Sequence, residues 1–357
     1  MKTDFLIIGG GVAGLSAAAR IAPLGSLTLI EAEPNLAYHA SARSAALYEP
    51  RYGNPAVVEL SLASGAFYHG SGLLTPRGFM LVDSPDQEAR FRATIREMQL
   101  EAIGLDEARG LFPILNPETI GFAAYAPHAW DIDTDLLLQT YAKDARHAGA
   151  TIVTGARVTA ITRTPGGWRV EAGGQVYEAR LLIDAAGAWA DEVAAMAGIA
   201  PLGIQPYRRS MARIPAPGGL DVTHWPMVIG GNEDWYCKPD AGALIVSPAE
   251  EDPMPPHDAW ADDMVLAEGL ARYEEAVTEP VTRMIANWAG LRSFAPDRAP
   301  VIGFAPQDAG FFWLAGQGGY GFQSAPGASA LVADLIAGRT PALAPATVAA
   351  LSPARFG

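Results

Sequence analysis

Short apolar runs separated by glycine-rich turns characterise the beginning of the chain. Residues 5–8 form a continuous apolar run, which predicts a parallel strand covered on both faces. A turn with four glycines follows, then a helical pattern over residues 15–22 and a second apolar strand that ends at Glu31. Strand, turn, helix and strand in this order predict a βαβ unit of a parallel sheet.

The pattern of the remaining chain mixes helices with many short strands. The predicted helices are one that begins near Pro55, one at 87–100, one at 136–148 with Asp133 as its N-cap, and one at 328–337. The predicted strands are a pair within 72–82, three segments at 151–153, 158–164 and 168–172 with a turn at 165–167, and two apolar strands at 181–183 and 311–315. Residues 201–280 are predicted to contain strands and turns only.

Glycines or other small residues follow the apolar strands at the beginning, middle and end of the chain. This spacing predicts one ligand-binding domain assembled from residues 1–70, 131–200 and 293–357, and a substrate domain from residues 71–130 and 201–292. The expected fold class is α/β (α+β), with a Rossmann-like domain interleaved with an antiparallel-sheet domain.

Composition excludes several classes of protein. Of 357 residues, 50% are hydrophobic, and Lys and Arg number 25 against 39 Asp and Glu, which gives a net charge of −14. A chain this apolar is not intrinsically disordered. The acidic balance argues against nucleic acid or an anionic membrane as an electrostatic partner. No segment reaches the ~20 continuous apolar residues of a membrane span.

Cys237 is the only cysteine, which excludes an intrachain disulfide and a cysteine-based metal cage. The acidic residues at 131–135 have the spacing of a calcium loop, but Leu136 occupies the position of its glycine, so no metal is expected. The early apolar run is interrupted by glycines and belongs to a folding unit, so we expect no signal peptide. A cytoplasmic protein is expected, with a peripheral position at the inner membrane as the alternative.

The first turn carries the most specific motif. Gly9, Gly11 and Gly14 satisfy G-x-G-x-x-G, with Val12 and Ala13 between the last two. These glycines permit a tight turn, a close approach of pyrophosphate to the backbone, and close packing of helix on strand. Glu31 lies where a carboxylate accepts hydrogen bonds from an adenosine ribose, which disfavours NADP. The fingerprint fits NAD or FAD, and the interleaved domains favour FAD.

In the order and content of its motifs, the chain resembles the D-amino-acid oxidase-type (DAO) FAD oxidoreductases, which include glycine and sarcosine oxidases. The resemblance is strongest to the bacterial FAD-dependent D-arginine dehydrogenase branch. The motifs that carry it, besides the glycine fingerprint, are residues 38–39, 43–46, 132–135, 185–189, 206, 208–210, 225–227, 236, 238–242, 288–294 and 317–321. They extend over nearly the whole chain.

The resemblance implies oxidative deamination of D-amino acids by hydride transfer from Cα to flavin N5, with non-covalently bound FAD. Arg209 and Arg292 would bind the substrate carboxylate, Tyr52 and Tyr236 would line the pocket, and Gly319 would face the amine. The residues implied in cofactor binding, besides the fingerprint and Glu31, are Ala32, Ala40, Ser41, Ala42, Arg43, Ser44, Ala45, Ala46, Leu47, Val158, Ala186, Gly187, Trp189, Gly318, Gly319, Tyr320, Gly321, Phe322 and Gln323. No side-chain base is obligatory, because the cofactor carries the chemistry.

Two positions depart from the arginine-preferring relatives. Phe79 replaces an acidic residue that would meet the substrate guanidinium, and Leu47 replaces a pocket histidine. A buried guanidinium without a partner costs about several kcal/mol. We therefore expect apolar or aromatic D-amino acids to be preferred over D-arginine.

Other readings stay open at this point. An oxidase of N-alkylated amino acids and a 2-hydroxy-acid dehydrogenase would use the same carboxylate clamp, and a non-catalytic flavoprotein is the third alternative. Arg208 adjoins Arg209, and only the resemblance selects between them. The acidic residues 250–252 are expected to form a solvated loop, with a mobile lid over 249–263 as the alternative. Trp225 and Trp260 are expected to pack in the protein. Oxygen and a quinone are both candidate electron acceptors.

Overall fold

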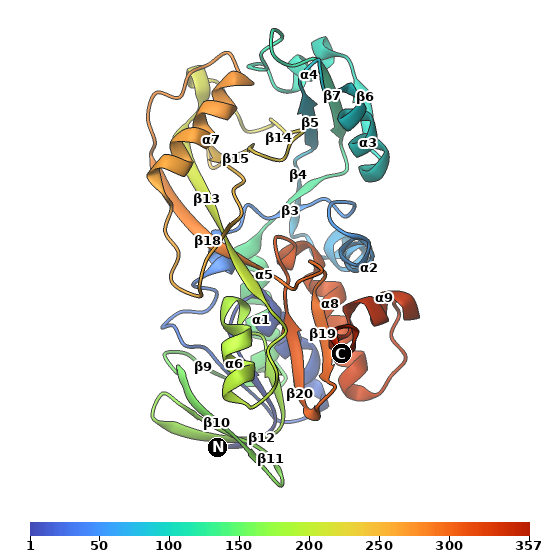
Figure 1. Cartoon of the computed structure of the whole chain (residues 1–357), viewed down its shortest axis with the longest axis vertical. Helices are drawn as coiled ribbons and strands as arrows, with labels where there is room; N and C mark the ends of the chain where they lie inside the picture. The colour runs from blue at the N-terminus through green and yellow to red at the C-terminus, as the bar shows by residue number, and fades with distance from the viewer.

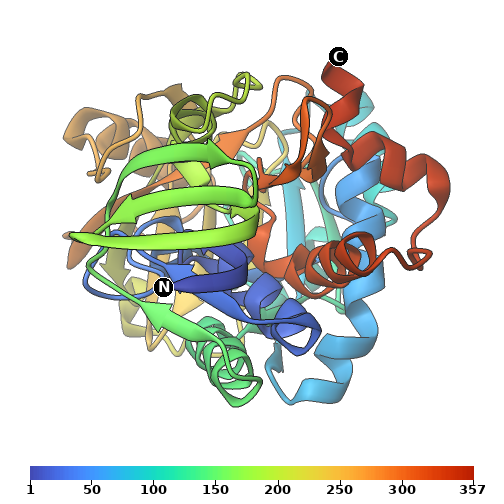
Figure 2. The ribbon, with the colours of Figure 1, turned by 90° about the horizontal axis from the view of Figure 1, so that it is seen from below.

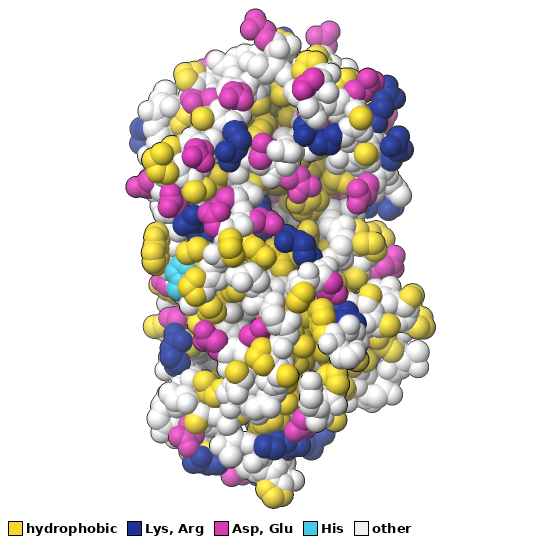
Figure 3. Space-filling view, in the orientation of Figure 1, with side chains coloured by type: hydrophobic (Ala, Val, Ile, Leu, Met, Phe, Trp, Pro, Cys, Tyr) yellow, Lys and Arg dark blue, Asp and Glu magenta, His cyan; other side chains and the backbone are white.

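The computed structural model describes residues 1–357, with two large sheets at opposite ends of an elongated molecule (Figure 1). One sheet has eight strands and the other nine, and a small three-stranded sheet of β3 (Leu47–Tyr48), β4 (Leu74–Pro76) and β8 (Trp130–Ile132) accompanies them. Lys and Arg side chains are interspersed with Asp and Glu over the face shown in Figure 3. No helix of the chain is both long enough and apolar enough to cross a lipid bilayer.

The eight-stranded sheet contains the βαβ unit predicted for the beginning of the chain. Its strand order is β10-β11-β12-β1-β2-β9, with β20 beside β12 and β19 beside β20. β1 lies parallel to both β2 and β12. The strands are β1 (Lys2–Ile8), β2 (Leu27–Ile30), β9 (Thr151–Val153), β10 (Val158–Thr164), β11 (Gly167–Ala172), β12 (Gln175–Asp184), β19 (Val301–Ala305) and β20 (Asp308–Ala315).

Both faces of this sheet are buried, which explains why residues 5–8 are apolar at every position. Phe5 and Ile7 face a core shared with α1 (Val12–Ile21), α5 (Thr134–His147) and α8 (Gly321–Ala337), whereas Leu6 and Ile8 face a core shared with α6 (Ala190–Met196). Successive residues of a strand point to opposite faces, so a covered parallel strand needs an unbroken apolar run.

Helix α8 begins at Gly321, directly on the second glycine-rich turn, and not at residue 328 as predicted. Pro326 lies inside the helix and has no amide hydrogen to donate to the carbonyl of Phe322. The hydroxyl of Tyr68, from α2 (Pro55–Ser71), donates to that carbonyl instead. A side chain distant in sequence therefore stabilises a helical turn that the local pattern disfavours.

α2 and α8 pack closely because small residues lie between them. A Cβ atom on Gly327 would lie 2.5 Å from the carbonyl oxygen of Leu60, and the amide of Gly327 donates to Oγ of Ser64 at 2.9 Å. Figure 2 shows α2 (light blue) beside α8 and α9 (Pro345–Leu351), both red. This contact attaches the α2 segment to the helix that follows the second glycine turn.

The nine-stranded sheet is antiparallel except where β14 pairs with β5, and its order is β17-β13-β16-β15-β14-β5-β7-β6, with β18 on β13. Its strands are β5 (Phe79–Asp83), β6 (Glu101–Ile103), β7 (Phe122–Ala126), β13 (Gln205–Pro215), β14 (Met227–Gly230), β15 (Tyr236–Asp240), β16 (Ala243–Ser247), β17 (Asp252–Pro253) and β18 (Ala286–Phe294). Met80 and Val82 face a core with α4 (Leu105–Leu111) and α7 (Asp263–Glu275), while Phe79 and Leu81 face the opposite side.

β13 and β18 are the longest pair of this sheet and extend toward the eight-stranded sheet (Figure 1). Their register runs from Gln205 opposite Phe294 to Arg213 opposite Ala286. This pair brings two arginine-bearing strands to the space between the sheets.

Several local predictions are confirmed and others are wrong. α2, α3 (Glu88–Met98), α5 and β9 to β11 lie where expected, and Asp133 caps α5 by accepting from the amide of Leu136 at 2.9 Å. Residues 72–82 contain two strands as expected, β4 and most of β5, but these do not pair with each other, because β4 pairs with β8 and β5 with β7 and β14. Residues 201–280 also contain helix α7, which Asp262 caps through its side chain.

Candidate cofactor and substrate site

Two adjoining cavities open between the sheets. The outer cavity lies at the carboxyl ends of β1, β2 and β12, and the inner cavity lies between the first glycine turn, β13, β18 and the N-terminus of α8. They adjoin each other and share eight lining residues, namely Gly11, Ala40, Ser41, Arg43, Ala185, Gly187, Gly290 and Leu291.

The first glycine turn brings α1 close to the sheet and leaves backbone donors in the cavities. Gly9 has φ of 108°, and a Cβ atom there would collide with the carbonyl oxygen of Ala185. The amides of Gly11 and Ala13 have no acceptor in the protein, and both residues line a cavity. The amide of Val12 donates to Oγ of Ser41. Free amides at a helix N-terminus favour a bound anion such as a phosphate.

Glu31 follows β2 and lines the outer cavity. Its Oε2 accepts from the amide of Gly10 at 2.6 Å, and its Oε1 accepts from the amide of Glu33 at 2.8 Å. These two bonds hold the carboxylate in one orientation. Each oxygen still has a lone pair for a hydroxyl of a ligand.

The second glycine turn supplies donors to the inner cavity. Gly318 has φ of 55°, and a Cβ atom there would collide with the ring of Phe294. The amides of Gly319, Gly321 and Phe322 have no acceptor in the protein, and all three residues line the inner cavity. The N-terminal end of α8 therefore presents a positive dipole to any group that carries negative charge there.

Two further polar groups in the inner cavity are unpaired. Nε2 of Gln317 and Oγ of Ser293 are buried and have no hydrogen-bond partner. Buried polar groups in folded proteins are nearly always paired, so such groups indicate a ligand. Together with the amides of the two glycine turns and the carboxylate of Glu31, they suit an extended dinucleotide such as FAD.

Arg209 and Arg292 lie on the same face of the β13–β18 pair. Arg209 is opposite Gly290 and Arg292 is opposite Tyr207, so the two arginines are diagonal neighbours, and both line the inner cavity. Nε of Arg209 donates to the carbonyl of Glu250 at 2.9 Å and its Nη2 to Glu251 at 3.2 Å. The guanidinium of Arg292 has no hydrogen-bond acceptor in the protein, although the chain carries excess acid.

The charges of this pair influence each other. Burial, together with the nearby charge of Arg292, lowers the pKa of Arg209. Burial alone would lower the pKa of Arg292 as well, but Tyr236, Tyr52 and Tyr320 outweigh it and raise that pKa. Two adjacent guanidinium groups with one unpaired form a site that favours a carboxylate.

Arg208 points elsewhere and pairs with acids of the segment expected to be solvated. Its Nη2 lies 2.6 Å from Asp252, and its Nε lies 3.7 Å from Glu250, whose side chain is only 8% exposed. Burial raises the pKa of Glu250. The expectation of a solvated loop at 250–252 is therefore wrong for Glu250, whereas Glu251 and Asp252 are 36% and 47% exposed while they contact the arginines of β13.

An apolar cluster, called the apolar wall below, reaches the inner cavity through Met211 and Ala45. Phe79 is buried in one cluster with Tyr236, Met211 and Ile229, and Leu47, Tyr52 and Trp288 pack against this cluster. The hydroxyl of Tyr236 donates to Sδ of Met211 at 3.4 Å. The hydroxyl of Tyr52 donates to Glu233 at 2.9 Å, and burial raises the pKa of Tyr52.

The structure brings most of the candidate residues to the two cavities. Those at the outer cavity are Gly9, Gly11, Glu31, Ala32, Ala40, Ser41, Arg43, Val158, Ala186, Gly187 and Trp189. Those at the inner cavity are Gly11, Val12, Ala13, Ala40, Ser41, Arg43, Ser44, Ala45, Gly187, Arg209, Arg292, Gly318, Gly319, Gly321 and Phe322. Those that line neither are Gly14, Ala42, Ala46, Leu47, Tyr52, Phe79, Tyr236, Tyr320 and Gln323.

Several cavity residues were missed by the sequence reasoning. Met211 is two residues after Arg209 on the same strand, so strand alternation could have placed it on the cavity side. His257 and Ala259 line the outer cavity from a proline-rich segment, and no local pattern indicates this. Trp260, expected to pack in the protein, is 66% exposed, whereas Trp225 is buried as expected.

Sequence comparison identifies relatives among oxidoreductases. Glycine oxidase from Geobacillus kaustophilus is 26% identical over 235 residues, which cover 64% of this chain and 60% of that protein. D-amino acid dehydrogenase 2 from Ralstonia nicotianae is 48% identical over 65 residues, which cover 18% of this chain and 15% of that protein. The matches thus span less than two thirds of these relatives. The comparisons do not single out the D-arginine dehydrogenase branch that the motifs suggested.

Solved structures share the fold over the whole chain. The crystal structure of L-proline dehydrogenase from P. horikoshii superposes with a TM-score of 0.85 at 23% identity and covers 99% of this chain and 98% of that one. At this identity the likeness shows the fold. Residues 4–335 match the family described as DAO, FAD dependent oxidoreductase. With the glycine turns, Glu31 and the adjoining cavities in place, the chain belongs to the DAO family of FAD-dependent oxidoreductases.

Proposed function

We propose that this protein oxidises D-amino acids with apolar or aromatic side chains and uses FAD as the immediate electron acceptor. The observation that carries the proposal is the unpaired guanidinium of Arg292, which lies beside Arg209 in the inner cavity. Of the three arginines that line the inner cavity, Arg43 pairs with Asp258 and Arg209 with Glu251, so Arg292 leaves a place for one further anion. The α-carboxylate of an amino acid is such an anion.

The proposed roles of the chain's residues follow from their donors. Arg292 would bind the carboxylate through two parallel N–H groups, and Arg209 would add charge from the neighbouring strand. The backbone at Gly319 would face the amine. The free amides of the α8 N-terminus would stabilise negative charge that develops during the oxidation, as oriented donors do in other enzymes.

FAD, when bound, would take up the two electrons of the substrate. The substrate loses the hydrogen on Cα and one proton from nitrogen, which leaves an imino acid. Water then adds to the imino carbon and releases ammonia, which gives the 2-oxo acid. We assign no side-chain base, because the cofactor provides the redox chemistry and the protein provides orientation and charge.

The apolar wall is the basis of the proposed side-chain preference. Phe79 and its neighbours Tyr236 and Met211 offer no carboxylate to a cationic side chain. A guanidinium buried against this wall would lose hydration, and the carboxylate of Glu233 beside it already accepts from the hydroxyl of Tyr52. Apolar and aromatic side chains instead gain about 25 cal/mol for each Å² of apolar surface that they bury.

An oxidation of glycine or N-alkylated amino acids is the alternative, and the glycine oxidase relative favours it. Such substrates keep the carboxylate that the arginines would bind, and they leave the apolar wall uncovered. A 2-hydroxy acid would satisfy the arginines equally. The D-configuration rests on the motif resemblance and on the short match to a D-amino acid dehydrogenase.

The test is anaerobic mixing of the holoenzyme with separate substrates while the flavin absorbance is followed. We expect bleaching by D-Phe, D-Met and D-Leu, with a rate at least about tenfold higher than with D-Arg. L-Phe serves as the matched control for configuration. Admission of air afterwards shows whether oxygen reoxidises the flavin, and addition of a quinone tests the other acceptor.

Each outcome decides between the alternatives. Faster bleaching by D-Arg than by the apolar D-amino acids would contradict the role of Phe79. Bleaching by sarcosine, glycine or 2-hydroxy acids alone would favour the second function. A flavin that no substrate bleaches would indicate a non-catalytic flavoprotein.

We also propose that the two large sheets are the cores of the cofactor and substrate domains expected from the sequence, with their boundaries at residues 70, 130, 200 and 292. Limited proteolysis of the holoenzyme tests this division. Residue 292 lies inside β18, so we expect cleavage in the loops nearest the four boundaries, with the loop at 295–300 for the last of them, and none inside either sheet.

A further inference from the structure

A proline-rich segment of the chain lies across the outer cavity. We call residues 252–262 the strap. It begins at β17, which pairs with β13 through Asp252 and Pro253, and it ends at Asp262, the N-cap of α7. Between these two anchored ends, His257 and Ala259 line the outer cavity. The strap therefore covers a cavity whose opposite wall is formed by the other sheet.

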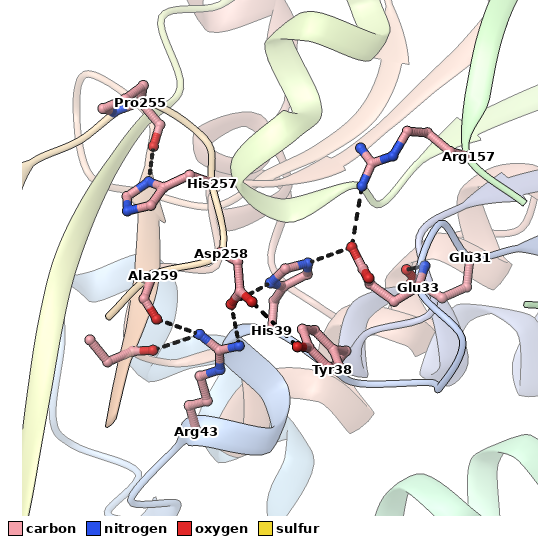
Figure 4. A network of polar contacts seen from close by, with 11 residues as sticks. Glu31, Glu33, Tyr38, His39, Arg43, Arg157, Pro255, His257, Asp258 and Ala259 are labelled. Atoms are coloured by element: carbon pink, nitrogen blue, oxygen red, sulfur yellow. Dashed lines mark hydrogen bonds and ion pairs between the residues drawn. The ribbon is translucent and has the colours of Figure 1, made fainter. Parts of the chain in front are cut away.

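Asp258 connects the middle of the strap to the opposite wall (Figure 4). Its Oδ1 lies 2.5 Å from Nη2 of Arg43 and 3.8 Å from Nδ1 of His39, and its Oδ2 accepts from the hydroxyl of Tyr38 at 3.3 Å. These three partners belong to one segment, residues 38–43, which lines the same cavity. Asp258 is the acceptor common to all three.

Arg43 reinforces this contact from the other side. Its Nη1 donates to the carbonyls of Ala259 and Ala289, each at 2.8 Å, so it binds the strap and β18 together. Arg43 also lines both cavities. The side chain of Arg43 thus links the segment 38–43 at the outer cavity to the strap and to β18, the strand that carries Arg292.

The polar contacts continue around the cavity to the segment after β2. Nε2 of His39 lies 3.1 Å from Oε1 of Glu33, and Nη2 of Arg157 lies 3.2 Å from the same oxygen. Glu33 is two residues from Glu31, and the amide of Glu33 donates to the carboxylate of Glu31. The chain of contacts in Figure 4 therefore runs from the strap to the carboxylate of the dinucleotide fingerprint.

We propose that the strap is a latch that retains FAD and that Asp258 is the residue that closes it. A dinucleotide in the outer cavity cannot leave without separating the strap from residues 38–43. The side chain of Asp258 is 55% exposed, so water can replace its contacts when they break, and Arg43, which is 15% exposed, keeps its hydrogen bond to the carbonyl of Ala289. The prolines of the strap limit the conformations that it samples when open, which favours reclosure. This inference depends on the family's cofactor and is independent of the substrate.

The test is the rate of FAD release from the holoenzyme after dilution, followed as the rise of free-flavin fluorescence. Asp258→Asn removes the charge and keeps the size, and we expect release at least about tenfold faster than from the unmodified protein. Glu268→Gln is the matched control, because Glu268 is an exposed acid of α7 outside the strap. Its release rate should stay within about twofold of the unmodified protein.

Salt provides a second readout. Exposed ion pairs are screened as the Debye length falls from about 10 Å at 0.1 M to 3 Å at 1 M salt. Release from the unmodified protein should accelerate with added NaCl, and release from the Asp258→Asn variant should respond much less.

A variant that keeps the charge distinguishes the loss of the latch contact from a general loss of structure. Asp258→Glu should release FAD within about threefold of the unmodified rate. The proposal is wrong if Asp258→Asn releases FAD as slowly as the control, or if Asp258→Glu releases it as fast as Asp258→Asn. Binding of FAD by the unmodified protein without any turnover of amino acids would overturn the proposed function and leave this test intact.

Discussion

A Cβ atom added to Gly319 would lie 2.9 Å from Nη1 of Arg292. The backbone of the second glycine turn therefore lies against the guanidinium, and no side chain fits between the two. This contact places the unpaired charge of Arg292 next to the free amides at the N-terminus of α8. The proposed carboxylate site and the positive end of α8 thus lie side by side in the inner cavity.

The first prediction concerns this contact. Gly319→Ala should displace the guanidinium of Arg292, because the new methyl group would meet its Nη1 and Cζ at 2.9 and 3.0 Å. We expect KM for the amino acid to rise at least about tenfold, since a misplaced guanidinium weakens a bond worth about 1.5–3 kcal/mol. Steady-state kinetics and the flavin content measure the effect, and the flavin should remain bound.

Gly110→Ala is the control for this variant. Gly110 lies in α4, and an added Cβ would meet nothing within 4 Å. Alanine is favoured over glycine in a helix by about 0.5–1 kcal/mol, so stability should rise slightly and KM should not change. An unchanged KM in both variants would show that the contact has no part in substrate binding.

The second prediction concerns the guanidinium itself. Arg292→Lys keeps the charge but loses the planar pair of donors that matches a carboxylate. We expect kcat/KM to fall about 10- to 100-fold, mostly through KM. Arg213→Lys is the control, because Arg213 lies on the neighbouring strand β13 and pairs with Asp240 outside the cavities. Equal kinetics for the two variants would exclude Arg292 from carboxylate binding.

The third prediction concerns the apolar wall. Phe79→Leu removes aromatic volume next to Tyr236 and Met211, so the ratio of kcat/KM for D-Trp over D-Leu should rise severalfold. The change should also cost about 1 kcal/mol of stability. Phe122→Leu is the control, since Phe122 packs at the edge of the same cluster and stacks on Phe91. If both variants change the ratio equally, the wall does not select the side chain.

The fourth prediction concerns a buried acid near Tyr52. The side chain of Glu49 is 2% exposed, and its Oε2 has no hydrogen-bond partner and lies 3.5 Å from Nε2 of His128. Burial raises the pKa of Glu49 to about 7, although the amide of Arg51 opposes this. Burial and the nearby charge of Arg51 also lower the pKa of His128, which disfavours a compensating charge on that imidazole.

The sign of the pH effect follows from this raised pKa. Between the ordinary pKa of a glutamate and about 7, the folded protein holds a proton that the unfolded chain has released. Stability therefore falls as pH rises through this window, by at most about 3 kcal/mol. Glu49→Gln should remove this loss, so that the variant is more stable than the unmodified protein at pH 8 and similar at pH 5.

Urea unfolding of both proteins at the two pH values measures the difference. Glu59→Gln is the control, because Glu59 is an exposed acid on α2. Its effect should be small and the same at pH 5 and pH 8. If the stability difference between the Glu49→Gln variant and the unmodified protein does not change with pH, the pKa of Glu49 is not raised.

Local chemistry explains which features were predictable. The N-cap Asp133 and the β10–β11 hairpin depend on hydrogen bonds between residues close in sequence, and β1, β2 and β9 were recognisable from their short apolar runs. The beginning of α8 was mispredicted because its stability depends on Tyr68, which lies 254 residues away from the carbonyl that it binds. Helix α7 was missed because the proline- and acid-rich residues before it hide its cap.

The sequence by itself determined that the chain binds a dinucleotide, because the glycines, the helix and Glu31 must stand at short, defined spacings for that purpose. Only the tertiary structure decided that Arg209 and not Arg208 faces the inner cavity, since this depends on how β13 pairs with β18 and which acids contact each arginine. It also decided that the strap covers the outer cavity. Contacts between residues more than 200 positions apart, such as Arg43 and Asp258, leave no periodic trace in the sequence.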